Sequence, residues 1–434
     1  FFLSFQNSFL QAQTTYTNDW IEFDKIYYEI KVIENGLHRI SGNTLAAENL
    51  PLTPDFYQLY NKGKEIPFYI HNPTGNFDGN DYIEFYGQRN DGEFDTQLYW
   101  YESHQPSNTL SLFCDTATYY LVVSDTNNNL RYENAENNLN NAPPKDNYFW
   151  HTNSVVTANQ HYEGEPFRLG GINNHFADFE SGEGFVSVPI DIGNDQSWNV
   201  WTRSIYTQNN TLQATVSTKI IGMSNDFDVN PDHHIQIKVN GNVAIDDSLE
   251  AYFTQDYEFE VPLSQLNEPQ TSMNFAALNS ISEQNRIAVA NMNIRYPRTF
   301  DFSDKHEFLF EIDNTQNHYI EITNFDGGSN PFLYDLTNNL RIFPILENNV
   351  YKFHFLAQAE NGTTRQLYFV NPTPSFPYET VTETTNLQSI NFTDFSLLEN
   401  QGNYLIVTHP KLMQGSINQV CLLYTSPSPR DIGE

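Results

Sequence analysis

The chain has 434 residues and a formal net charge of −33, from 21 basic and 54 acidic side chains. Such an acidic chain repels nucleic-acid phosphates and anionic lipid headgroups, so a nucleic-acid partner is not expected. Aromatic residues make up 15% of the chain, which excludes a disordered protein, and two cysteines are too few for a disulfide-stapled fold or a cysteine-ligated zinc module. The length predicts about two to four domains with sizeable apolar cores.

The start of the chain, residues 1–16, is rich in apolar residues and carries no charge, and small or polar residues stand near its end. This pattern predicts the remnant of a secretory signal peptide whose basic beginning is missing. The alternative interpretation is a short N-terminal strand.

Residues 17–135 have the pattern of an N-terminal β domain. Short runs of aromatic and β-branched residues alternate with turn residues, and Asn35-Gly36 is a typical hairpin dipeptide. One helical turn is expected near residues 44–49. The predicted strands include Trp20–Phe23, Tyr27–Val32, Leu37–Ile40, Tyr82–Tyr86 and Tyr119–Val123.

An Asn-rich stretch that ends in two prolines, Pro143 and Pro144, predicts a loop and a domain boundary. Residues 146–299 then show regularly spaced strands, which favour a jelly-roll-like β-sandwich. Residues 300–400 have the length and the strand pattern of an immunoglobulin-like sandwich. We therefore predict an all-β protein of consecutive β-sandwich domains.

The pattern changes after residue 400. Tyr404–Thr408 is a continuous apolar run, which fits the first buried strand of an α/β domain beginning over residues 402–420. Residues 421–434 differ in composition and resemble a translated sequencing adapter, so they are excluded from the fold prediction. The alternative is a genuine Pro-Ser linker.

Two loops gather hard oxygen ligands around glycines. One contains Asp78, Asn80 and Asp81, and the other contains Asp91 and Asp95. Calcium binds six to eight such oxygens, so calcium is the cofactor that these five residues could hold. The spacing does not match an EF-hand, and hairpin turns favour the same residue types.

No catalytic residue is identified from the chain. Cys114 stands alone just before a strand, and a lone cysteine is more often structural than nucleophilic. Glu163, Glu165, Glu180 and Glu183 could supply a glycosidase-like carboxylate pair, but they lie in turn-like contexts.

Several segments together carry a family resemblance. They resemble, in the same order, blocks of the gingipain-like cysteine peptidases of the type IX secretion system, over about residues 17–420. The segments are Gly36–Ile40, Asp81–Gly87 with Asn90–Gly92 and Asp95, Asp115 with Tyr119–Leu121, Ser181–Phe185, Asn293–Arg298, Tyr319–Phe325 and Gly402–Pro410.

The resemblance implies a secreted or outer-membrane-associated protein of a Gram-negative bacterium that acts as a sortase. Such enzymes cleave C-terminal signal domains from secreted cargo through a cysteine acyl-enzyme, with a histidine as acid and base. Both catalytic residues lie deep in the peptidase domain, so none is assigned here. The resemblance also implies a cargo protein as the substrate and a partner in the outer-membrane secretion system. The alternative function is that of a non-enzymatic adhesive or carbohydrate-binding cell-surface protein.

Overall fold

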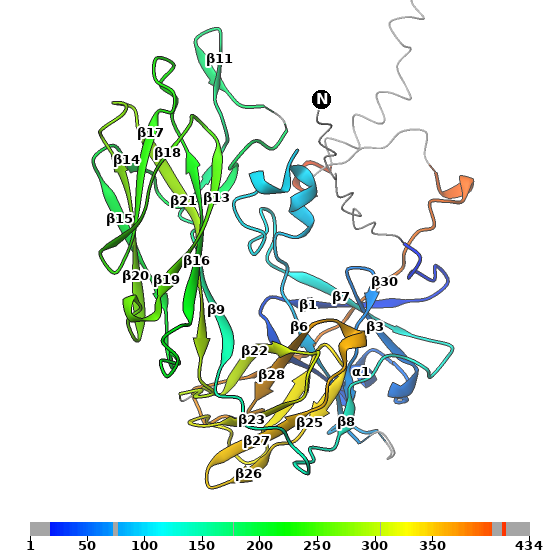
Figure 1. Ribbon diagram of the computed structural model, residues 1–434. Coiled ribbons are helices and arrows are strands. Elements are labelled where there is room, and N and C mark those ends of the chain that lie inside the picture. The colour runs from blue at the N-terminus through cyan, green and yellow to red at the C-terminus, as the bar shows by residue number, and fades with distance from the viewer. Residues whose placement is uncertain (1–17, 73–76, 177, 304, 402–409, 414–434) are drawn as a thin grey trace, which may run out of the picture.

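The computed structural model describes residues 18–72, 77–176, 178–303, 305–401 and 410–413. Within these ranges the chain is almost entirely β, which confirms the predicted fold class of consecutive β-sandwiches (Figure 1). None of the helices described there is both long and apolar enough to cross a membrane. The predicted signal remnant 1–16, the strand 404–408 and the adapter-like segment 421–434 lie outside the described residues.

The first sandwich is built from two sheets that enclose one core. The core contains Ile30, Leu59, Phe85 and Leu121, all fully buried. Five strands form one sheet, in the order β30 (Gln388–Ile390), β1 (Tyr27–Val32), β7 (Ala117–Val123), β3 (Tyr57–Asn61) and β4 (Lys64–Glu65). Four strands form the other, in the order β29 (Val381–Thr384), β2 (Gly36–Ser41), β6 (Tyr82–Gly87) and β5 (Tyr69–Ile70).

The one α-helix of the described residues, α1 (Gly42–Ala47), follows β2 in this sandwich. Its first turn is capped by the Ser41 hydroxyl, which accepts a hydrogen bond from the Thr44 amide at 3.2 Å. This helix corresponds to the turn predicted near residues 44–49. The other helical segments are short 3₁₀ turns: η1 (Pro54–Phe56), η2 (Phe94–Leu98), η3 (Glu102–His104), η4 (Leu263–Gln265), η5 (Ala359–Asn361), η6 (Leu398–Asn400) and η7 (Pro410–Leu412).

The second sandwich also packs two sheets face to face, around Val216, Ile237, Phe275 and Ile294. One sheet has the order β14 (Ile190–Asp191), β21 (Arg286–Arg298), β16 (Gln213–Gly222) and β19 (Thr254–Pro262), with β9 (Phe149–Val156) also pairing with β21. The other has the order β15 (Asp195–Trp201), β20 (Gln270–Leu278), β17 (His233–Val239) and β18 (Asn242–Leu249). Two small hairpin-like pairs accompany them: β10 (Gln160–Tyr162) with β13 (Gly184–Val186), and β11 (Phe167–Leu169) with β12 (Ile172–Asn174).

A tight turn joins β17 to β18. Asn240 and Gly241 have φ values of 45° and 82°, which is the left-handed geometry that a two-residue hairpin turn requires. The Asn-Gly dipeptide therefore marks this hairpin.

The third sandwich has an aromatic core that includes Phe302, Phe310, Phe353 and Phe369. Its larger sheet has the order β22 (Glu307–Asp313), β28 (Thr364–Val370), β24 (Phe332–Asp335), β25 (Leu340–Ile342) and β8 (Glu133–Ala135). Its smaller sheet has the order β23 (His318–Ile322), β27 (Val350–Phe355) and β26 (Ile345–Glu347).

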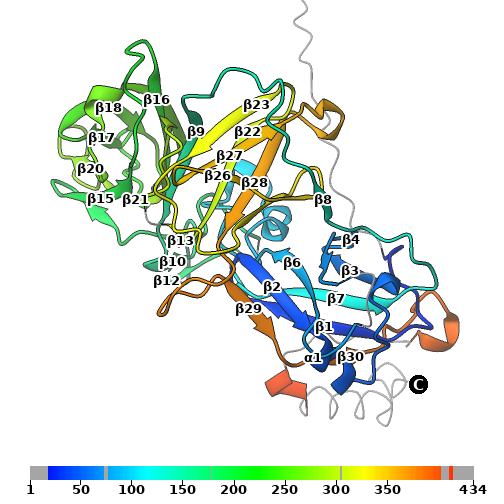
Figure 2. The same cartoon turned by 90° about the horizontal axis from the view of Figure 1, so that it is seen from below.

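The first and third sandwiches exchange strands, so the predicted boundaries 17–135 and 300–400 are wrong as self-contained units. Residues 381–390, assigned to the third sandwich, pair with β1 and β2 of the first, and Leu387 enters the first core. Residues 133–135, assigned to the first, pair in parallel with β25 of the third. Figure 2 shows β29 and β30 beside the first sandwich. Short strands of this kind are positioned by long-range pairing, which local sequence pattern does not report.

The predicted strand Trp20–Phe23 is also wrong, because this segment forms turns. The ring of Trp20 instead packs on aromatic rings of the first sandwich, 5.6 Å from Tyr27 and 5.4 Å from Phe392. The same aromatic character that suggested a strand thus serves to hold the returning C-terminal segment.

Candidate functional sites

The first predicted calcium loop is a closed turn. The Asp81 carboxylate accepts hydrogen bonds from the Asp78 amide at 2.9 Å, from His71 Nδ1 at 2.9 Å and from Asn72. These contacts hold the pKa of Asp81 below its usual range, and the hydrogen bond from the Asp78 amide has the largest effect. Asp78 in turn accepts from the Asn80 amide at 2.7 Å. The oxygens proposed as calcium ligands therefore serve as turn acceptors.

The second predicted loop is built in the same way. Asp95 is buried, and its carboxylate accepts from the Leu112 amide at 2.7 Å. Asp91 accepts from Lys62 Nζ and from the Glu93 amide, both at 3.1 Å. Within the described ranges no group of three or more His, Cys, Asp and Glu side chains is arranged to hold a metal ion.

Cys114 is exposed rather than buried. Its sulfur accepts a hydrogen bond from the Thr116 amide at 3.3 Å, and none of the hydrogen bonds found among the described residues joins it to a histidine. A thiol without a base lacks the activation that cysteine catalysis requires.

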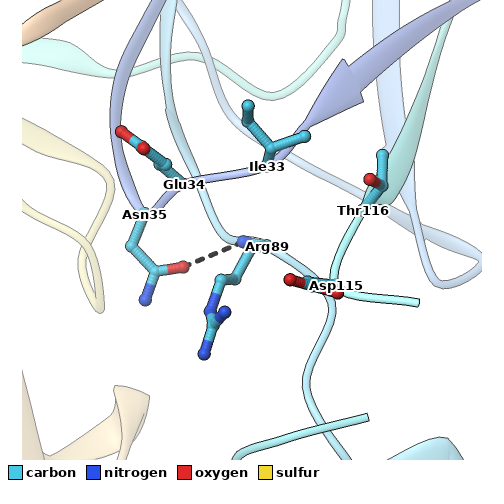
Figure 3. A pocket seen from close by; sticks show the side chains of 6 residues that line it. All are labelled: Ile33, Glu34, Asn35, Arg89, Asp115 and Thr116. Carbon is cyan, nitrogen blue, oxygen red and sulfur yellow. Dashed lines mark hydrogen bonds between the residues drawn. The ribbon is translucent and has the colours of Figure 1, made fainter. Parts of the chain in front are cut away.

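A hollow of about 670 Å³ lies beside this cysteine at one end of the first sandwich. Figure 3 shows its lining, in which the Arg89 amide donates to the Asn35 side-chain oxygen at 2.9 Å. The carboxylates of Glu34 and Asp115 and the guanidinium of Arg89 give the hollow mixed charge. The arrangement offers polar contacts to a ligand, but it contains no nucleophile paired with a base.

Two of the four glutamates considered as glycosidase-like carboxylates, Glu180 and Glu183, accept hydrogen bonds within a turn. Glu180 accepts from the Glu165 amide at 2.9 Å, and Glu183 accepts from the Glu180 amide at 3.0 Å. Burial raises the pKa of Glu180. Glu163 lies 3.3 Å from His175 Nε2. The carboxylates of Glu180 and Glu183 thus accept main-chain hydrogen bonds, and that of Glu163 forms a surface ion pair.

Sequence reasoning missed a buried polar link between the first and third sandwiches. Glu84 on β6 is fully buried, and its carboxylate accepts from Arg39 Nε at 2.6 Å and from the Tyr334 hydroxyl of β24 at 2.6 Å. The only local sign of this link was a glutamate within a predicted strand. Its partner Tyr334 lies 250 residues away in the sequence, so local pattern could not identify the contact.

Sequence reasoning also missed a groove of about 830 Å³ between the second and third sandwiches. The segment 145–152 lines one side, and Leu309–Asp313 of β22 lines another. No sequence motif marks it because its walls come from separate domains.

No protein-family model matches the chain, and no curated protein matches it. Among solved structures, the chain is similar to dimeric latent PorU from Porphyromonas gingivalis, with a TM-score of 0.53 and 10% sequence identity. The match covers 80% of this chain and 32% of the PorU chain, so the chain spans about a third of that protein's length. At this identity the likeness establishes a coarse PorU-like fold.

Two carbohydrate-binding modules also match, at a much lower level. The CBM36-1 domain of a multidomain xylanase from the hindgut metagenome of Trinervitermes trinervoides has a TM-score of 0.20 and 8% identity, covering 34% of this chain and 96% of that one. A CBM36 module in complex with calcium and xylotriose has the same TM-score and identity, covering 32% and 98%.

Proposed function

We propose that this chain is the non-catalytic β-sandwich region of a secreted gingipain-like cysteine peptidase, acting as a sortase of the type IX secretion system. The observation that carries the proposal is the PorU-like fold over 80% of the chain. The ordered motifs of the sequence support it independently, since they point to the same family.

The described residues have the character of a scaffold in this proposal. None of the hydrogen bonds found among them joins Cys114 to a histidine, and the carboxylates of Glu180 and Glu183 are held in turn contacts. The nucleophilic cysteine and its histidine would belong to a peptidase domain that follows residue 400. Its substrate would be a secreted protein with a C-terminal signal domain, and its location would be the cell surface or outer membrane, beside a secretion-system partner.

The test is to express the complete gene and label its product with a thiol-directed peptide probe. The proposal expects labelling of one cysteine beyond residue 420, unchanged in a Cys114→Ser variant. Loss of labelling in Cys114→Ser, or a gene that encodes no cysteine peptidase domain after these sandwiches, would refute it.

A carbohydrate-binding role is the second candidate, favoured by a hollow of about 530 Å³ at one end of the third sandwich. Tyr378 is 58% exposed there, and its ring packs against that of His306, with centroids 4.2 Å apart and planes tilted by 39°. Asp326 lies 3.3 Å from His306 and could accept from sugar hydroxyls. Retention on neutral polysaccharide gels that is lost in Tyr378→Ala would favour this candidate, and unretarded migration would exclude it.

A further inference from the structure

The groove between the second and third sandwiches combines an open strand edge with an aromatic wall. Its volume is about 830 Å³. Figures 1 and 2 both place β22 on the side of the third sandwich that faces β9. Grooves at domain interfaces are common binding sites.

One wall is the main chain of β22. Side chains alternate between the two faces of a strand, yet five consecutive residues, Leu309–Asp313, line the groove. The backbone itself must therefore form part of the wall. In the described part of the chain β22 pairs with β28 alone, so the N–H and C=O groups of its other edge have no strand partner.

The opposite wall is the outward face of β9 and β21. Trp150 and Thr152 of β9 lie on the same face as Arg295 of β21, because Thr152 and Arg295 are cross-strand neighbours. The Arg295 guanidinium stacks on the Trp150 ring at 4.5 Å. This pair presents a flat, partly apolar surface to whatever lies in the groove.

The charges along β22 select the occupant. Glu311 and Asp313 are exposed in the groove, where their carboxylates accept hydrogen bonds from Gln366 and from Thr315 and form no ion pair found among the described residues. Two basic side chains also line the groove: Lys145 is paired with Glu321 at 3.1 Å, and Arg295 stacks on Trp150. Two carboxylates outside any ion pair therefore stand against one such cation, Arg295. Two copies of this edge would bring like charges together, which disfavours pairing between identical chains. A basic strand would instead be attracted.

We propose that this groove binds an extended, basic peptide segment of another protein, which adds a strand to the free edge of β22. Main-chain hydrogen bonds to β22 supply the affinity, as in other cases of strand addition. Glu311 and Asp313 select lysine or arginine side chains, and the Trp150–Arg295 pair covers the outer side of the strand. The inference stands whether or not the chain belongs to a peptidase.

The test measures the fluorescence anisotropy of a labelled, end-capped decapeptide as the 434-residue chain is added. The peptide alternates valine and threonine and carries two lysines. A second peptide has the same sequence with N-methyl groups on alternate residues, and a third has glutamates in place of the lysines. The N-methyl groups remove main-chain donors, and the loss of two main-chain hydrogen bonds should weaken binding by at least about tenfold. The glutamate peptide should also bind more weakly, and Glu311→Lys should reverse that order.

Two matched tryptophan variants distinguish binding in the groove from nonspecific binding elsewhere on the surface. Trp150→Ala should weaken the lysine peptide by about two- to tenfold. Trp201→Ala removes a tryptophan that stacks on Arg203 at 4.6 Å outside this groove, and it should change nothing. Circular dichroism of each variant checks that it is folded.

Four results would overturn the proposal, and three of them come from the peptide experiments. They are equal binding of the plain and methylated peptides, equal weakening by the two tryptophan variants, and no binding of any peptide at millimolar concentration. Binding of a neutral xylo-oligosaccharide that competes with the lysine peptide would also overturn it.

Discussion

The buried hydrogen bond between Tyr334 and Glu84 should hold the first and third sandwiches together. Tyr334→Phe removes only the hydroxyl that donates to the Glu84 carboxylate at 2.6 Å. The ring itself packs against Tyr132, 4.3 Å away, and remains in the variant. The substitution therefore isolates one hydrogen bond between two sandwiches.

Its magnitude follows from burial. Both side chains are fully buried, and a hydrogen bond to a charged group contributes about 1.5–3 kcal/mol. Tyr334→Phe should thus lower the free energy of unfolding by about 2 kcal/mol. Glu84→Gln leaves Arg39 without its anion, and breaking a buried pair costs about 3–5 kcal/mol.

The assay is urea unfolding followed by circular dichroism, for the two single variants and the double variant. Because contacting residues are not additive, the double variant should lose less than the sum of the two single losses. The control is Tyr319→Phe, which removes a 2.6 Å bond to the partly exposed side chain of Glu321 and should cost less than about 1 kcal/mol. If Tyr334→Phe costs no more than Tyr319→Phe, the proposed role of the buried link is refuted.

Three further predictions concern the returning segment, the partly buried His151 and the first predicted calcium loop. Leu387→Ala should cost about 3 kcal/mol of unfolding free energy by urea titration, because Leu387 lies in the first core; a cost below 1 kcal/mol would mean that the segment is not integral. Burial, and to a smaller extent the charge of Arg298, lowers the pKa of His151 to about 4 in the folded protein. In the unfolded chain its pKa is about 6.5, so as the pH falls the unfolded state takes up a proton before the folded state does. Its contribution to stability should therefore fall by about 2–3 kcal/mol between pH 7 and pH 4.5, and His151→Phe should remove that part of the pH dependence; an unchanged slope would contradict this. Asp81→Ala should lower the melting temperature equally with calcium and with a chelator, since Asp81 serves as a turn acceptor; a loss seen only with calcium would instead show a metal site.

The sequence pattern predicted the β-sandwich class and the positions of many strands because these depend on local alternation. Tyr27–Val32 and Tyr82–Tyr86 alternate or run as buried strands, and both are strands in the structure. The hairpin expected at Asn35-Gly36 is wrong, because β1 and β2 lie in different sheets. The same dipeptide at Asn240-Gly241 does close a hairpin, with both residues in left-handed backbone geometry.

The exchange of strands between the first and third sandwiches could not be predicted from the same signals. Residues 381–384 pair with β2, about 340 positions earlier, and nothing in their local pattern names that partner. The role of Glu84 was hidden for the same reason. A carboxylate in a strand predicts exposure unless its partners are known, and here Tyr334 comes from another domain.

The most direct test of the proposed function is intact-mass analysis of a reporter protein that carries a C-terminal signal domain. The reporter is incubated with the complete gene product, with and without iodoacetamide, and separately with the 434-residue chain. The account predicts cleavage by the complete product that iodoacetamide abolishes, and no cleavage by the chain alone. Cleavage by the 434-residue chain, or an intact reporter in every sample, would contradict it.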